Sequence, residues 1–240
     1  MDIYWLEQTE ADVPAENDWF SSGEETRLSQ LRFAKRRADW RLGRWTAKRA
    51  LAVWLDIPAH PLALAQIEIR PASTGAPEVF IANQPASVSL SLSHREGRAV
   101  CAVAPAGAEL GCDLELIEPR SDAFISDYFT GEEQTLVAQA SAADRPRLLA
   151  LLWSAKESAL KALRTGLRLD TRRVIVSPIV AFDLQGWSAL RVRCADGRVF
   201  RGWWQQAGSF VRTLVATPPP NPPIRLILPD YVPNMAVLCA

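Results

Sequence analysis

The sequence predicts a mixed α+β fold made of two related halves. A helical pattern covers residues 145–165, and a strand-like segment at 111–115 lies upstream of it. Further strand-like segments follow between residues 174 and 216. Residues 45–51 and 153–159 share the order Trp, hydroxyl residue, Ala and Lys. A short match of this kind also arises by chance between alanine-rich helices, so the repeat suggests two halves without establishing them.

Length and composition exclude several classes of protein. At 240 residues and 48% hydrophobic content, the chain has enough apolar residues for one large domain or two small ones. The 27 basic and 27 acidic residues balance, so the chain as a whole is not expected to bind nucleic acid. The start lacks a basic region followed by an apolar run, and no apolar stretch is long enough to span a bilayer. We therefore expect a cytoplasmic protein with no membrane partner.

The cysteines are expected to be structural. Cys101, Cys112, Cys194 and Cys239 show no C-x-x-C spacing, and the first three lie in apolar, strand-like surroundings. His60 and His94 are the only histidines, so a zinc site would need cysteine ligands from distant parts of the chain. We predict reduced cysteines, mainly in the core.

The first half contains a helix with a row of basic residues. Ser21 or Ser22 is the expected N-cap of a helix from about Glu24, and a second helix follows. In this second helix the apolar residues share one face, and the opposite face carries bases spaced i, i+4, i+7 and i+11: Arg37, Arg41, Arg44 and Lys48. Such a row is either a solvated face or an anion-binding face, and the spacing does not decide between them.

A hairpin is expected around His94. Residues 87–92 alternate small polar and apolar residues, a turn follows at 93–97, and the chain returns as a strand from Arg98. A lone histidine at a strand end is more often structural than functional. Here Ser93 and Arg95 add hydrogen-bond donors that suit a phosphate group.

The second half begins with short helices. Residues 122–128 are predicted to form one, and Thr130 starts another with a capping-box pattern that ends at Glu133. The long helix over 145–165 is expected to stop at Gly166. Asp196 and Gly197 mark a hairpin among the later strands.

Carboxylates in the predicted strand and long helix indicate a metal site. Strand alternation puts Asp113 and Glu115 on one face of the sheet, about 7 Å apart. Helical spacing puts Trp153, Glu157 and Lys161 on one side of the long helix, with apolar residues opposite. If the helix crosses the strand, Glu157 adds a third carboxylate, and three oxygen ligands suit Mg²⁺. The alternative is an ordinary Glu157–Lys161 surface pair, worth a few tenths of a kcal/mol.

These two segments resemble a paired family signature. Residues 111–115, GCDLE, followed by residues 153–161, WSAKESALK, are similar to the G-x-D-x-E and W-x-x-K-E-[SA]-x-x-K motifs of the 4'-phosphopantetheinyl transferases. The second motif fits at every fixed position, and residues 129–133 resemble the family's intervening Phe-to-Glu segment. The resemblance covers about residues 27–170, and the strand-rich segment that follows matches the family more loosely. The length and basic first half resemble the larger, pseudo-dimeric class that activates peptide synthetases.

The resemblance implies an activity and a set of site residues. The expected fold is two similar lobes related by pseudo-twofold symmetry, with the active site in the cleft between them. The expected reaction moves the phosphopantetheine arm of coenzyme A to a serine of an apo acyl or peptidyl carrier protein and releases 3',5'-ADP. The carried-over Mg²⁺ ligands are Asp113, Glu115 and Glu157; the catalytic residues are Glu157 and Lys161; and the coenzyme contacts are Arg36, Arg37, Arg44, Ser93, His94, Lys156 and Lys161.

The resemblance also implies an arrangement of domains. Residues 1–108 would form a basic, coenzyme-binding lobe, 109–217 a metal-binding lobe and 218–240 a proline-rich tail. From Ile224 to Ala240 this tail either packs as a strap on the surface or is mobile, and the sequence does not decide which. A monomer is expected. The carrier protein, from fatty-acid, polyketide or peptide synthesis, is not identified by the sequence.

Two departures from the family pattern keep other interpretations open. Ala76 stands where the family often has a lysine, and Arg95 stands where it often has a serine or threonine. Arg95 is a candidate replacement for the missing charge. A catalytically degenerate member that binds coenzyme A or a carrier protein is the second interpretation. A different metal-dependent phosphoryl-transfer enzyme, such as a nuclease, is the third, and the zero net charge argues against it.

Overall fold

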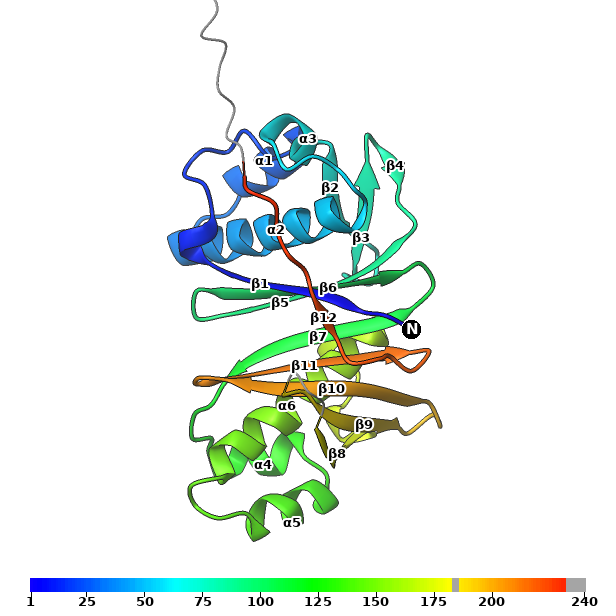
Figure 1. Ribbon diagram of the computed structural model, residues 1–240. Helices are drawn as coiled ribbons and strands as arrows, with labels where there is room; N and C mark the ends of the chain where they lie inside the picture. The colour runs from blue at the N-terminus through cyan, green and yellow to red at the C-terminus, as the bar shows by residue number, and fades with distance from the viewer. Residues whose placement is uncertain (183–185, 232–240) are drawn as a thin grey trace, which may run out of the picture. The chain divides into compact units, whose positions relative to one another are not determined.

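The computed structural model describes residues 1–182 and 186–231, and it confirms the mixed α+β fold (Figure 1). The chain divides into two compact units. Among the described residues, the N-terminal unit comprises Tyr4–Ala106 and 225–231, and the C-terminal unit comprises Met1–Ile3, 107–182 and 186–224. The division at Ala106 lies close to the predicted domain boundary at 108. The two chain ends differ from that prediction, because Met1–Ile3 group with the C-terminal unit and the segment that begins at Arg225 groups with the N-terminal unit.

The N-terminal unit is built around one long helix and a four-stranded sheet of order β12-β1-β6-β5. Helix α2 packs on β6, β1 and β5 (Figure 1). A three-stranded sheet, β2-β3-β4, completes the unit. The helices are α1 (Ser22–Ser29), α2 (Ala34–Trp54) and α3 (Pro61–Ala65), and the strands are β1 (Tyr4–Thr9), β2 (Ile67–Pro71), β3 (Pro77–Ile81), β4 (Gln84–Pro85), β5 (Val88–Arg95), β6 (Arg98–Pro105) and β12 (Ile224–Arg225).

The C-terminal unit is a five-stranded antiparallel sheet of order β7-β11-β10-β9-β8, on which helix α6 packs, mainly against β7 and β11. Leucine, alanine and valine side chains of the helix and strands form its core. The elements are β7 (Glu109–Leu116), α4 (Asp122–Tyr128), α5 (Gly131–Gln139), α6 (Arg145–Ala162), β8 (Val174–Phe182), β9 (Ser188–Cys194), β10 (Val199–Ala207) and β11 (Phe210–Thr217).

Local signals placed several boundaries correctly. Ser21 is the N-cap of α1, and its side chain accepts a hydrogen bond from the Glu24 backbone N–H in a capping box. Thr130 makes the equivalent contact with Glu133 at the start of α5. The hairpin predicted at Gly197 joins β9 to β10, and Gly197 has the positive φ of 89° that such a turn requires.

The end of α6 differs from the prediction. The helix stops at Ala162 rather than at 165, because Arg164, not Gly166, takes the first left-handed position, with φ 56°. The Arg164 N–H donates to the Lys161 carbonyl and the Thr165 N–H donates to the Leu160 carbonyl, which is the Schellman pattern. A non-glycine residue at that position gave no sequence signal.

The first part of the C-terminal tail is a strap on the N-terminal unit. The Leu226 N–H donates to the Trp5 carbonyl at 2.8 Å, and Arg49 donates to the Pro229 carbonyl at 2.5 Å. The Tyr231 ring packs edge-on against Trp45, with 4.9 Å between the ring centres. Residues 232–240 of the predicted tail lie outside the described residues.

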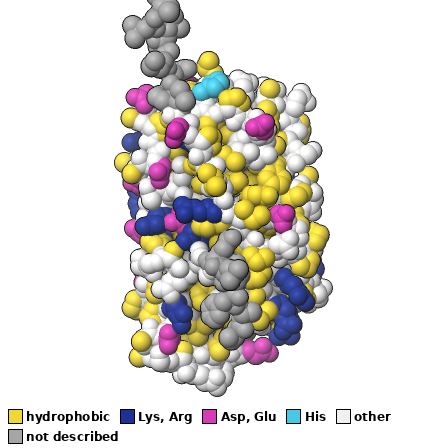
Figure 2. All heavy atoms as spheres, viewed as in Figure 1, with side chains coloured by type: hydrophobic (Ala, Val, Ile, Leu, Met, Phe, Trp, Pro, Cys, Tyr) yellow, Lys and Arg dark blue, Asp and Glu magenta, His cyan; other side chains and the backbone are white. Residues whose placement is uncertain are grey.

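The cysteines within the described residues are buried, as the sequence predicts. Cys101, Cys112 and Cys194 are buried and form no disulfide bond among the described residues, and Cys239 lies outside those residues. Burial raises the pKa of the Cys194 thiol to about 11, with a further increase from Asp196. On the face shown in Figure 2, lysine and arginine side chains gather in separate groups. No described helix has the length and hydropathy needed to cross a membrane.

The contact between β7 and α6 leaves no room for a side chain at Gly111. A Cβ atom added there would lie 1.8 Å from the Ser158 carbonyl oxygen and 2.9 Å from the Ala162 nitrogen, both backbone atoms of α6. The helix therefore packs directly on the strand backbone.

We predict that Gly111→Ala destabilises the protein by at least about 2 kcal/mol, because α6 must move away from β7. Urea unfolding measures the loss. Gly131→Ala is the control, since no atom lies within 4 Å of a Cβ added there. Equal stability of the two variants would contradict the close packing.

Candidate functional site

Strand β7 directs its acidic side chains toward α6. Gly111 contacts the helix, and alternation along the strand puts Asp113 and Glu115 on the same face as Gly111. Both carboxylates are buried, with exposed fractions of 2% for Asp113 and 8% for Glu115. Buried carboxylates require positive partners or hydrogen-bond donors.

Lys161, in the last turn of α6, interacts with Asp113. Its ammonium donates to Asp113 Oδ1 at 2.7 Å and to the Cys112 carbonyl at 3.0 Å. Burial by itself lowers the pKa of Lys161, but the attraction of Asp113 and of Glu157 outweighs burial and raises it. Lys161 therefore carries a firmly held positive charge, and its side chain keeps 28% exposure.

Glu157 lies one turn before Lys161 and is half-buried. Burial raises the pKa of its carboxyl, repulsion from Asp113 raises it further, and Lys161 opposes both effects. The structure thus brings together three of the predicted site residues, two carboxylates and one ammonium, which we call the Asp113–Glu157–Lys161 cluster. A carboxylate with a raised pKa is a suitable proton acceptor near neutral pH.

Glu115 has a partner that the sequence did not reveal. Arg120 donates to Glu115 Oε2 at 3.2 Å, pairs with Glu118 at 3.0 Å and lies over the Phe124 ring at 5.1 Å. The sequence contained one signal for this contact. The turn at Glu118–Arg120 reverses the chain directly after the strand and so brings Arg120 back toward Glu115. In this structure Glu115 is therefore engaged by an arginine.

The donor chemistry of the cluster suits a divalent cation. Asp113 and Glu157 repel one another, and a cation between two carboxylates turns such repulsion into attraction. Within residues 1–182 and 186–231, however, no three Asp, Glu, His or Cys side chains are grouped to hold a metal ion. Asp113 and Glu157 are thus the two carboxylates whose arrangement suits metal ligands, whereas the Glu115 carboxylate accepts a hydrogen bond from Arg120.

Hydroxyl groups fix the helix above the sheet. Ser154 and Ser158 of α6 lie 2.9 and 2.7 Å from the Thr213 hydroxyl of β11, and Ser158 also donates to the Thr213 carbonyl. Thr213 is opposite Asp113 in the strand register. These contacts hold the helix turns beside the cluster and were not anticipated, because Thr213 is about 55 residues from its partners.

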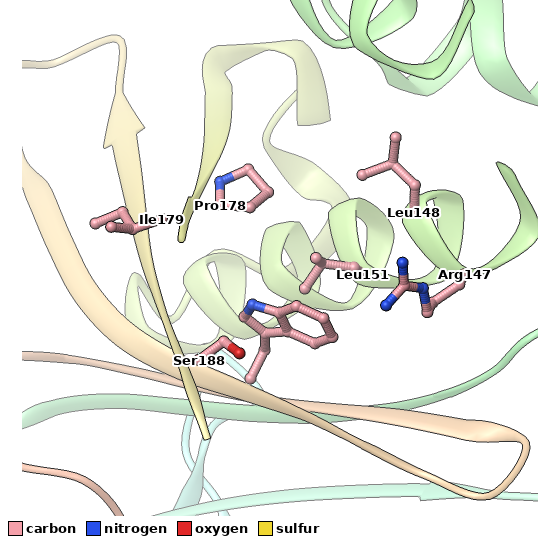
Figure 3. Close-up of a pocket in the computed structure, with 7 residues that line it drawn as sticks. Arg147, Leu148, Leu151, Pro178, Ile179 and Ser188 are labelled. Atoms are coloured by element: carbon pink, nitrogen blue, oxygen red, sulfur yellow. The ribbon is translucent and has the colours of Figure 1, made fainter. Parts of the chain in front are cut away.

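A separate cavity of about 260 Å³ lies at the other end of α6. Figure 3 shows Leu148 and Leu151 of the helix, together with Pro178 of β8, around this space. Its lining is largely apolar and includes none of the predicted site residues. It therefore does not belong to the cluster.

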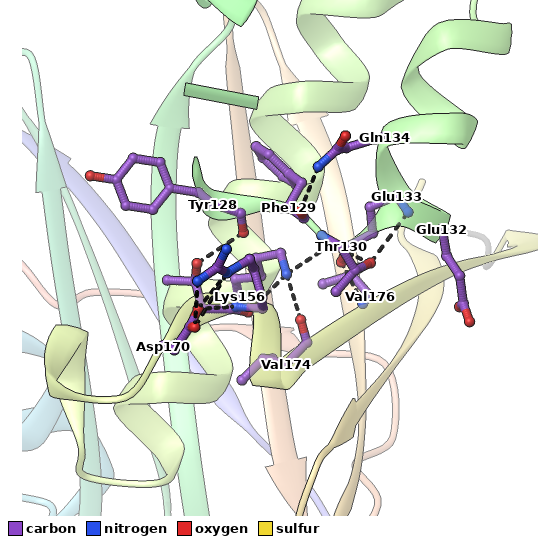
Figure 4. A network of polar contacts seen from close by, with 12 residues as sticks. Tyr128, Phe129, Thr130, Glu132, Glu133, Gln134, Lys156, Asp170, Val174 and Val176 are labelled. Atoms are coloured by element: carbon purple, nitrogen blue, oxygen red, sulfur yellow. Dashed lines mark hydrogen bonds and ion pairs between the residues drawn. The ribbon is translucent and has the colours of Figure 1, made fainter. Parts of the chain in front are cut away.

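Lys156 does not have the predicted phosphate contact. Its side chain is fully buried, and its ammonium lies 2.8 Å from Glu133 Oε2 and donates to the carbonyls of Thr171 and Val174 (Figure 4). Glu133 Oε1 in turn accepts from the Val176 N–H at 2.9 Å. Burial lowers the pKa of Lys156, and Glu133 opposes that effect. The prediction for Lys156 is corrected to a structural ion pair joining α5, α6 and β8.

The N-terminal unit contains an equivalent buried lysine–glutamate ion pair. Lys48 is fully buried, lies 2.5 Å from Glu24 Oε2 and donates to the carbonyls of Trp19 and Leu64. Glu24 Oε1 accepts from the Ile69 N–H, and Glu24, like Glu133, is the third residue of a capped helix. The repeat seen in the sequence is thus also a repeat of local structure.

Most other basic side chains in the predicted row of the first half bind partners within the N-terminal unit. Arg37 donates to two backbone carbonyls, Arg41 donates to Asn17 and Pro14, and Lys48 is buried. Arg44 stacks over Trp40 at 4.9 Å and lies 3.7 Å from Glu24. The alternative of a solvated basic face therefore does not describe Arg41, Arg44 and Lys48, which are half-buried or buried. Anion binding by Arg37 and Arg44 stays a prediction.

The remaining predicted coenzyme contacts stay predictions. Arg36 is exposed in the first turn of α2. Ser93 and His94 lie near the end of β5, opposite Val100 and Ala99 of β6, and His94 is exposed. The predicted hairpin is confirmed, with Glu96 and Gly97 in its turn at positive φ.

The site thus combines a buried carboxylate, Asp113, a half-buried one, Glu157, and a fixed ammonium, Lys161, and such groups suit the binding of an anionic, metal-bound ligand. Residues 109–214 match the family model of the 4'-phosphopantetheinyl transferase superfamily. The match supports this superfamily, and it includes the whole Asp113–Glu157–Lys161 cluster and Glu115. No curated protein matches the chain.

We predict that Lys156→Met lowers the free energy of unfolding by about 3–5 kcal/mol, because it leaves Glu133 buried without its cation. The double variant Lys156→Met/Glu133→Gln should regain part of this loss. Chemical denaturation measures both variants.

Lys35→Met is the control, because Lys35 is 73% exposed and lies 3.8 Å from its nearest acid, so its loss should cost less than about 0.5 kcal/mol. A Lys156→Met protein as stable as Lys35→Met would show that the buried pair contributes little.

Proposed function

We propose that the protein is a Mg²⁺-dependent 4'-phosphopantetheinyl transferase of the larger, two-lobed class. The observation that carries the proposal is the Asp113–Glu157–Lys161 cluster, which lies at the motif positions inside the segment matched by the family model. The substrate is coenzyme A and the acceptor is a serine of an apo acyl or peptidyl carrier protein. The repeated Lys–Glu pair supports two lobes of common design, related by pseudo-twofold symmetry.

The reaction is a substitution at phosphorus. The serine oxygen forms a bond to the phosphorus that carries the pantetheine arm, and the bond from that phosphorus to the bridging pyrophosphate oxygen breaks. The leaving group is 3',5'-ADP, and the serine gives up its proton. No nucleophile from the enzyme is required, so catalysis depends on positioning and on neutralising charge.

Each member of the cluster has a separate task. Asp113, Glu115 and Glu157 are the proposed ligands of Mg²⁺, which when bound neutralises the pyrophosphate charge. Lys161, held by Asp113, presents a fixed positive charge to the same phosphates. Glu157, or a water molecule beside it, accepts the serine proton, and its raised pKa supports that task.

The coenzyme contacts proposed in the N-terminal unit are Arg36, Arg37, Arg44, Ser93 and His94. Coenzyme A carries several phosphate charges, which gives a chain without net charge a reason to keep local bases. Arg44 supports this assignment best, because its guanidinium is oriented by the Trp40 ring beneath it.

A catalytically degenerate member that binds coenzyme A or a carrier protein is the second candidate. Ala76, where the family often has a lysine, favours it. The intact cluster favours the transferase, because a binding protein has no need to place two mutually repelling carboxylates together at a cost in stability.

We predict that the protein labels an apo carrier protein when incubated with Mg²⁺ and labelled coenzyme A, and that chelation of the metal abolishes the labelling. Glu157→Gln should lower the rate about 10²–10³-fold, because it removes a charge that acts in the transition state. Glu132→Gln is the matched control and should keep the wild-type rate, since Glu132 is 73% exposed on α5.

The outcome separates the two candidates. Coenzyme binding by calorimetry without labelling of several different carriers would favour the degenerate member. Equal rates for Glu157→Gln and Glu132→Gln would exclude the proposed site.

We also predict that Arg95→Ala weakens coenzyme A binding about tenfold, because Arg95 substitutes for the charge missing at Ala76. Calorimetry with coenzyme A and with dephospho-coenzyme A measures the effect. Unchanged affinity would remove this role of Arg95.

A further inference from the structure

An exposed group of arginines lies on the face of the C-terminal sheet opposite α6. Arg191 of β9 and Arg201 of β10 are direct partners in the strand register, and Arg193 follows Arg191 by two residues. Directly opposed residues and residues two apart share a face, at about 5 and 7 Å. All three side chains are exposed, whereas their neighbours Val192 and Phe200 point into the core. We call Arg191, Arg193 and Arg201 the arginine face.

The arginine face carries little compensating charge. Like charges directly opposite one another on a sheet are destabilising. In the part of the chain that the structure describes, the side chains of Arg191 and Arg201 make no hydrogen bond or ion pair, and Arg193 lies 3.5 Å from its acidic partner Glu132. Three other arginines of this unit have closer acidic partners: Arg147 pairs with Asp144 at 2.9 Å, Arg172 with Asp170 at 2.9 Å and Arg198 with Asp196 at 2.7 Å.

Apolar side chains lie among the arginines. Val199 is opposite Arg193 in the register and is 47% exposed. Ile175 of β8 is the other neighbour of Arg193, and Trp203 follows Arg201 on the same face; both are half-buried. Arginine combined with aromatic and aliphatic side chains is typical of protein–protein interfaces. Figure 2 shows Lys and Arg side chains gathered beside the position that the β9–β10 hairpin has in Figure 1.

We propose that the arginine face binds an acidic surface of a partner protein. An acidic partner supplies the negative charge that Arg191 and Arg201 do not find among the described residues, and the apolar residues between the arginines supply area to bury. A strand face suits an extended surface better than a small ligand, which requires a concave site. Nucleic acid fits less well, because the chain has no net positive charge to extend the local field.

The test uses the full-length protein and poly-L-glutamate as an acidic probe, with affinity measured by fluorescence anisotropy at low and at near-physiological salt. Arg191→Gln/Arg201→Gln should weaken binding about tenfold and reduce its salt dependence. Arg147→Gln/Arg172→Gln is the matched control, because it removes the same two charges from arginines that already have acidic partners. The control should remain within about twofold of wild type.

Three results would overturn the proposal: no binding of poly-L-glutamate by the wild type, an equal loss in the control, or equally tight binding of a DNA duplex. Thermal melting checks that both variants fold, and Arg191→Gln/Arg201→Gln should melt no lower than wild type because a repulsion is removed. The measurement requires neither coenzyme A nor transfer, so its failure leaves the proposed function untouched.

Discussion

The direct contact between the backbones of β7 and α6 is the constraint on which the candidate site depends. Gly111 has no side chain, so the helix approaches the strand closely enough for Lys161 to reach Asp113 and for Glu157 to share its charge environment. This contact explains the order of residues in the segment 111–115. Gly111 lets α6 pack on the strand backbone, and Asp113, the next residue on the same face, supplies the carboxylate. A wider separation would leave a buried acid without its cation, which is costly.

Buried ion pairs hold the helices that carry these side chains. In each unit, a lysine of the long helix pairs with the glutamate that caps a shorter helix, and the same glutamate accepts a backbone N–H from a neighbouring strand. One carboxylate therefore orients three elements at once. Only in the C-terminal unit is the next helical residue an acid, Glu157; in the N-terminal unit it is Arg49, which holds the C-terminal strap instead. The two units share this lysine–glutamate pair but differ at the helical residue that follows the lysine.

Sequence reasoning succeeded where local chemistry decides the structure. The caps at Ser21 and Thr130 and the face shared by Asp113 and Glu115 follow from neighbouring residues alone. It failed where the deciding partner is distant. Lys156 was assigned to phosphate by the family resemblance, which carries no information on burial, but Glu133, 23 residues away in the sequence, makes burial of this lysine possible. Arg120 was overlooked for a related reason: a turn fixes a reversal of the chain but not the direction of its side chains.

The central claim is that the Asp113–Glu157–Lys161 cluster holds a divalent cation beside a pyrophosphate, and direct metal binding tests it without relying on turnover. Mn²⁺, observed by electron paramagnetic resonance in the presence of coenzyme A, serves as the probe. The account predicts a single bound ion in the wild type and at least about tenfold weaker binding in Asp113→Asn and in Glu157→Gln. Mn²⁺ binding that is equally tight in all three proteins would contradict it.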